Sequence, residues 1–78
     1  MEKKIKLIWD FRGAEAEAIA KHHAQHLADY VATGASQDLE TGFSKISSMY
    51  SIAYFIVGEK SMPQHRDALK PHRGEFVE

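Results

Sequence analysis

The sequence predicts one small α+β domain in which two helices cover one face of a four-stranded antiparallel sheet. The chain has 78 residues, which is enough for a single domain only. Hydrophobic residues make up 44% and charged residues 27%, as is typical of folded globular chains. Segments with a two-residue hydrophobic period alternate with segments of helical period, in the order strand, helix, strand, strand, helix, strand.

The first half of the chain predicts one strand and one long helix. Residues 4–11 alternate between apolar and mostly polar side chains, which is typical of a strand. Residues 14–33 are rich in alanine, carry glutamates in the first turn and precede Gly34 as a C-cap, which predicts a helix. One stripe of this helix should face the sheet. The stripe consists of Ala16, Ile19, Ala20, His23, Ala24, Leu27, Tyr30 and Val31.

Two strands should follow the long helix. Residues 35–41 are small and polar and predict a surface loop. Residues 42–48 form a weak strand in which only Phe43 and Ile46 are large and apolar, so we expect it at an edge of the sheet. Residues 51–58 are rich in β-branched and aromatic side chains, which is typical of a central strand.

The last part of the chain predicts a short helix and a short strand. Ser61 and Gln64 form a capping-box pattern, so the helix should run from about Met62 to Lys70. Pro71 follows and ends it. Residues 75–78 should then add one short edge strand.

This element order is the split βαβ arrangement in duplicate, or ferredoxin-like order. Right-handed crossovers give the strand order 4-1-3-2 with both helices on one face. The other face should carry Lys4, Lys6, Ile8, Asp10 and Arg12, together with either Ile52, Tyr54 and Ile56 or Ala53, Phe55 and Val57. Both choices leave apolar area on an uncovered face, which predicts that the chain pairs with a second copy as a homodimer.

Together with the element order, His26, Leu27 and Tyr30 late in the long helix, ahead of Gly34, resemble the dimeric α/β-barrel proteins. That group includes the YCII-related and the muconolactone-isomerase-like proteins. The resemblance covers nearly the whole chain and implies two sheets that face each other across a dimer and enclose a ligand cleft. No catalytic motif of those families matches residue by residue, so the resemblance assigns no active-site residue.

The composition excludes several classes of function. The absence of cysteine excludes disulfides, thiolate metal sites and thiol nucleophiles. A net charge of -1 argues against nucleic acid or an anionic membrane as the main partner. Lys6 and Asp10 interrupt the apolar N-terminal stretch, so it predicts neither a signal peptide nor a membrane span. We expect a cytoplasmic protein without a cofactor.

The predicted topology brings six polar side chains to one end of the domain, namely Asp10, Arg12, Ser48, Tyr50, His72 and Arg73. Arg12, Tyr50 and Arg73 form a candidate binding site for a small carboxylate or phosphate, beside the N-terminus of the long helix. His72 is the candidate acid or base, and Asp10 would orient it. The alternative interpretation is an ordinary surface ion pair between Asp10 and one of the arginines.

The histidines offer a second candidate site. His22 and His26 lie one helical turn apart, so both imidazoles can address one metal ion, with His65 as a further ligand. His23 stands where the metalloprotease motif requires glutamate, which excludes that motif. The favoured interpretation is structural: His23 packs in the core with one nitrogen hydrogen-bonded, the other two are solvated, and no metal is expected.

We therefore predict a homodimer that binds a small anionic ligand in a cleft. A non-catalytic interaction subunit and a histidine-based metal-binding protein are the alternatives. The sequence identifies no substrate and leaves open whether any reaction is catalysed.

Overall fold

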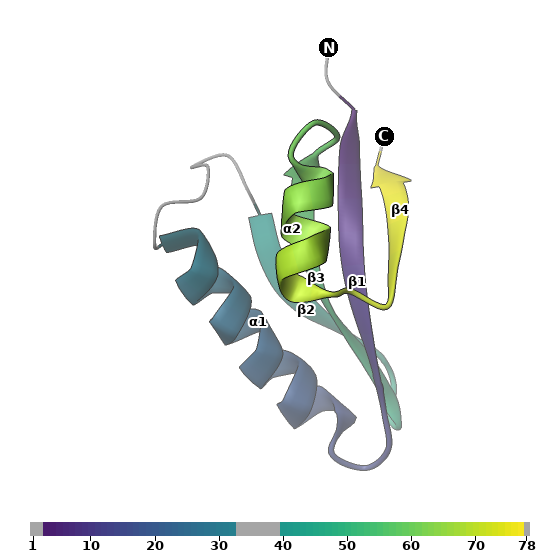
Figure 1. Ribbon diagram of the computed structural model, residues 1–78. Coiled ribbons are helices and arrows are strands. Elements are labelled where there is room, and N and C mark those ends of the chain that lie inside the picture. The colour runs from purple at the N-terminus through teal and green to yellow at the C-terminus, as the bar shows by residue number, and fades with distance from the viewer. Residues whose placement is uncertain (1–2, 33–39, 78) are drawn as a thin grey trace.

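The computed structural model describes residues 3–32 and 40–77 and shows a four-stranded antiparallel sheet with two helices (Figure 1). The elements are β1 (Lys4–Arg12), α1 (Ala16–Ala32), β2 (Glu40–Ser47), β3 (Tyr50–Gly58), α2 (Met62–Leu69) and β4 (Arg73–Val77). The strand order is β2-β3-β1-β4, which is the predicted order read from the other edge. The α+β architecture is therefore confirmed.

The long helix begins later than predicted because a turn precedes it. Gly13 has a φ of +117°, a conformation that favours glycine, and its carbonyl accepts a hydrogen bond of 3.1 Å from the amide of Ala16. The amide of Gly13 also donates to the carbonyl of Met49 at 2.8 Å, which ties this turn to the β2–β3 turn. The predicted cap at Gly34 lies outside the described residues.

Both edge strands begin earlier than the sequence predicts. Glu40 and Thr41 already pair with β3, so only residues 35–39 of the predicted loop lie outside the described part of the chain. Arg73 pairs with Ile8 of β1, so β4 begins two residues before the predicted strand. Backbone pairing with a central strand thus extends into segments whose side chains carry no strand pattern.

The register of β3 resolves the two choices that the sequence left open. Lys6, Ile8 and Asp10 of β1 pair with residues of β3, and paired residues share a face. Their partners are Ile56, Tyr54 and Ile52 in that order. Together these six side chains define the open face, whereas Ala53, Phe55 and Val57 belong to the core under the helices.

The open face exposes less apolar surface than the sequence predicts. Ile8 is 1% and Ile52 5% exposed. The ring of Tyr54 lies beside Gly42, where a Cβ atom would come within 2.5 Å of the tyrosine oxygen, and the ammonium of Lys6 is 4.6 Å from the ring centroid. Ile8 and Ile52 are thus buried within one copy of the chain, and self-association remains a prediction.

The core lies between the sheet and the helices, and α1 contributes only part of its predicted stripe. The residues of α1 that are buried are Ala16, Ala20, Ala24 and Leu27. The helix therefore contacts the sheet through one edge of the stripe. Ile19 lies at the opposite edge and is exposed, contrary to the prediction. No helix in the described part of the chain is long and apolar enough to cross a membrane.

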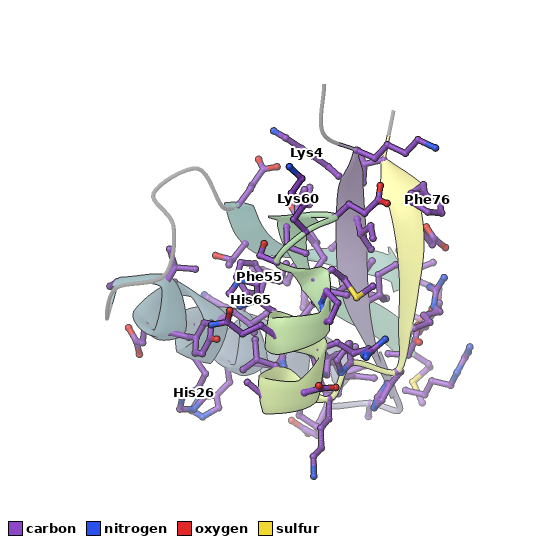
Figure 2. All side chains as sticks on the ribbon, turned by 45° about the horizontal axis from the view of Figure 1, so that its top comes forward. Lys4, His26, Phe55, Lys60, His65 and Phe76 are labelled. Carbon is purple, nitrogen blue, oxygen red and sulfur yellow. The ribbon has the colours of Figure 1, made fainter. Side chains whose placement is uncertain are left out.

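Two histidines lie against core residues. His65 of α2 is 4% exposed, its Nδ1 lies 3.1 Å from the Tyr30 hydroxyl, and its ring packs on Phe55 (Figure 2). His23 packs against Trp9, with ring centroids 4.8 Å apart, as predicted. Its buried Nε2 has no hydrogen-bond partner among the described residues. Desolvation lowers the pKa of both imidazoles, so both favour the neutral form.

We expect the free energy of unfolding to fall as the pH drops below 6.5, the ordinary pKa of histidine. Below that pH the unfolded chain binds protons that neutral His23 and His65 in the folded chain do not take up. Proton binding therefore stabilises the unfolded state relative to the folded state. Urea unfolding at about pH 7.5 and about pH 5 measures the loss. His65→Gln should reduce the pH dependence, whereas Gln25→Ala, on the exposed side of α1, should leave it intact. The same pH dependence in wild type and His65→Gln would contradict this role of His65.

Candidate functional site

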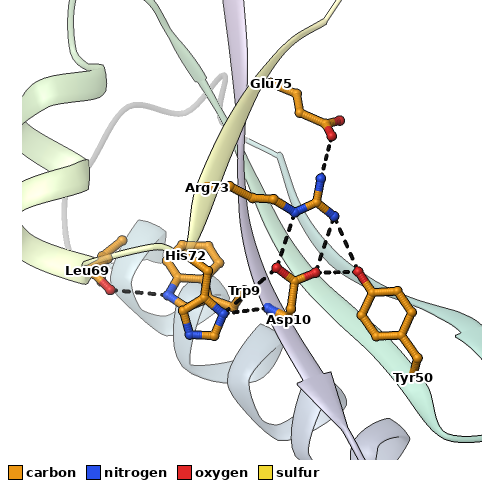
Figure 3. Close-up of polar contacts among 7 residues, drawn as sticks. All are labelled: Trp9, Asp10, Tyr50, Leu69, His72, Arg73 and Glu75. Carbon is orange, nitrogen blue, oxygen red and sulfur yellow. Dashed lines mark hydrogen bonds and ion pairs between the residues drawn. The ribbon is translucent and has the colours of Figure 1, made fainter.

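The predicted polar end is assembled around the carboxylate of Asp10. Arg73 donates to both carboxylate oxygens, from Nε and from Nη2, each at 3.2 Å (Figure 3). The hydroxyl of Tyr50 donates to Oδ1, and the remaining terminal nitrogen of Arg73 bonds to Glu75. We call Asp10, Tyr50, His72, Arg73 and Glu75 the polar cluster; it joins β1, β3 and β4.

His72 immediately precedes β4 and continues the backbone hydrogen bonding between β4 and β1. Its amide donates to the carbonyl of Ile8 at 2.9 Å, and its Nδ1 accepts from the amide of Asp10 at 2.8 Å. A neutral His72 therefore carries its proton on Nε2. The Asp10 carboxylate lies 4.0 Å from the same Nδ1. The two candidate catalytic residues thus lie together, but their nearest atoms already have partners.

Arg12 lies beside the polar cluster without a carboxylate partner in the described part of the chain. Its guanidinium stacks over the ring of Tyr50, 4.1 Å from the centroid. Ser48 lies in the turn between β2 and β3. The three predicted binding residues, Arg12, Tyr50 and Arg73, are therefore neighbours.

Charge pairing stabilises the ionised form of Asp10. The hydrogen bonds from Arg73 and then from Tyr50 lower the pKa of this carboxyl, and the same pairing raises the pKa of Arg73. Asp10 already occupies the guanidinium that an external anion would need. This geometry matches the alternative interpretation, an internal ion pair, and ligand binding by Arg73 and Tyr50 remains a prediction.

The histidine pair supplies two potential metal ligands. The Nε2 atoms of His22 and His26 are 2.9 Å apart on the exposed side of α1. His65 is buried against Tyr30 instead. Among residues 3–32 and 40–77, no group of three histidine, cysteine or acidic side chains is placed to hold a metal ion.

A groove that the sequence analysis did not foresee runs between α2 and β4, with a volume of about 370 Å³. Ile5 and Leu7 of β1 form its floor, Met62 and Arg66 of α2 form one wall, and residues 71–76 form the other. In Figure 1, α2 lies on the β3 side of β1, while β4 lies on the opposite side. All five residues of β4 are exposed.

Gly74 and Phe76 are the residues of β4 that face the groove, since they pair with Leu7 and Ile5. A Cβ atom on Gly74 would make ordinary contacts of 3.4 Å with Ile5 and 3.6 Å with Leu7. The missing side chain therefore leaves space above the floor. Phe76 is 69% exposed and lies at the outer edge of the sheet (Figure 2). The only feature of the sequence that indicates this groove is a glycine, Gly74, on the helix side of an edge strand.

Cationic side chains border the groove. Arg66 lines the wall formed by α2, and the ammonium of Lys3 lies 5.6 Å from the centroid of the Phe76 ring. The carboxylate of Glu75 is paired with Arg73. An apolar floor with a basic border suits a ligand that has both an apolar and an acidic part.

Comparisons with known proteins gave no match: no family model, no curated protein and no solved structure matches this chain. The likeness to the dimeric α/β-barrel proteins thus remains a resemblance.

Proposed function

We propose that this chain is a ligand-binding domain and that its site is the groove between α2 and β4. The observation that carries the proposal is the groove itself, with about 370 Å³ above buried Ile5 and Leu7. This volume is at the small end of the range for small-molecule sites, roughly 300–1,000 Å³. The ligand is therefore a small molecule with an apolar body.

Two other surfaces support this function less well. In the polar cluster, Arg73 is bonded to Asp10 and Glu75, so an external anion would have to displace a carboxylate of the protein. On the open face, Ile8 and Ile52 are already shielded within one copy. The groove, by contrast, has a buried apolar floor and lies open between two elements.

The test is an NMR titration of ¹⁵N-labelled protein with 1-hexanol, a neutral apolar probe. We expect saturable amide shifts confined to the groove, at Ile5, Leu7, Met62, Gly74 and Phe76. Gly74→Val should abolish them, because its methyl groups would fill the space above the floor. Ile46→Ala, which removes an exposed apolar side chain elsewhere, should not. The absence of saturable shifts in the wild-type protein would refute the proposal.

Self-association through the open face is the second candidate function. Tyr54 and Ile56 support it, because both are only half-buried there. A dimer would sediment at twice 8.8 kDa.

A further inference from the structure

We infer that the ligand of the groove is a small organic acid, with its carboxylate on Arg66 and its apolar chain over Gly74. This inference rests on the proposed function of the groove. Met62 and Arg66 both line the wall and lie four residues apart on α2, so they are neighbours on one helix face. An apolar contact and a charged contact are therefore available side by side.

The guanidinium of Arg66 is only partly used by the protein. In the part of the chain that the structure describes, its one carboxylate partner is Asp67, at 3.3 Å from Nε, and both side chains are exposed. Consecutive helix residues do not face each other, so this pair is weakly held. The two terminal nitrogens of Arg66 remain suited to a bidentate carboxylate.

The other polar groups at the groove also favour an acid. His72 accepts the amide of Asp10 on Nδ1, so its second nitrogen is a donor. Lys3 adds a positive charge near Phe76. The carboxylate of Glu75, which also lines the groove, is held by Arg73. Apart from Glu75, which is paired with Arg73, the polar side chains that border the groove thus offer donors.

Gly74 determines how long the apolar part of the ligand can be. The nearest atoms that a Cβ there would meet belong to Ile5 and Leu7 on the floor of the groove. Any side chain at this position would therefore occupy space that the end of the ligand needs. We expect Gly74→Ala to fold and to shift the preference from hexanoate towards butanoate.

The test compares hexanoate with 1-hexanol, which has the same chain length and no charge. The wild-type protein should bind hexanoate roughly tenfold more tightly, because a hydrogen bond to a charged group is worth more than a neutral one. Arg66→Gln should remove this preference and leave hexanol binding unchanged. Arg12→Gln, which changes an arginine on the other side of the sheet, is the matched control. High salt should weaken hexanoate binding only.

The outcomes separate the inference from the function on which it rests. Equal affinities for hexanoate and hexanol in the wild-type protein would overturn the inference and leave the groove as a site for neutral ligands. Failure of both probes to bind would overturn the proposed function as well. A preference for hexanoate that is lost in Arg12→Gln but kept in Arg66→Gln would place the acid beside the polar cluster, and would also overturn the inference.

Discussion

Phe55→Ala is expected to lower the free energy of unfolding by about 3–5 kcal/mol, the usual cost of deleting a fully buried phenylalanine side chain. Phe55 is 0% exposed at the centre of β3, and its ring contacts those of Tyr30 and His65. The cavity would therefore open where α1, α2 and the sheet meet. Such a loss approaches the whole stability of many small domains.

Urea unfolding followed by circular dichroism measures this effect. If Phe55→Ala does not fold, Phe55→Leu keeps the result quantitative, with an expected loss of about 1 kcal/mol. The matched control is Phe43→Ala on β2, where the ring is already exposed to solvent. Equal losses at the two positions would show that Phe55 is not the centre of the core.

Trp9→Ala is expected to cost about 3–5 kcal/mol for the same reason, since the side chain of Trp9 is buried. Trp9 also makes a hydrogen bond: its Nε1 donates to the carbonyl of Leu69 at 3.2 Å (Figure 3). This bond joins the end of α2 to β1 and so holds one wall of the groove.

Trp9→Phe separates the contribution of packing from that of the hydrogen bond. It retains an aromatic ring and removes the hydrogen bond, which should cost about 1–2 kcal/mol. Amides of α2 should exchange with deuterium faster in this variant, while those of α1 should not. Unchanged exchange in α2 would mean that packing alone holds the helix.

The element order could be predicted because strand and helix periods are local properties of the sequence. β1 alternates except at Ile8, and α1 is long enough for its alanine-rich stripe to show. The register of β3 could not be predicted, because both faces of Tyr50–Gly58 carry large apolar side chains. The burial of His65 was also missed, since a helix of 8 residues is too short to show which face is buried.

The candidate site was only partly predictable, because the topology determines which residues lie close together but not which of them form ion pairs or hydrogen bonds. Strand order alone brought Asp10, Tyr50 and Arg73 together. Whether the guanidinium of Arg73 would bind Asp10 or an external anion depends on distances of a few ångströms between side chains. Whether a groove forms depends on how far α2 lies from β4, and no residue pattern predicts that distance.

The most direct test of the ligand site is a search for nuclear Overhauser effects between bound hexanoate and the labelled wild-type protein. The groove predicts contacts from the methyl end of hexanoate to Leu7, Met62 and Phe76, which line the groove together with Gly74. Contacts to Tyr54 and Ile56 instead would place the ligand on the open face of the sheet and contradict the account.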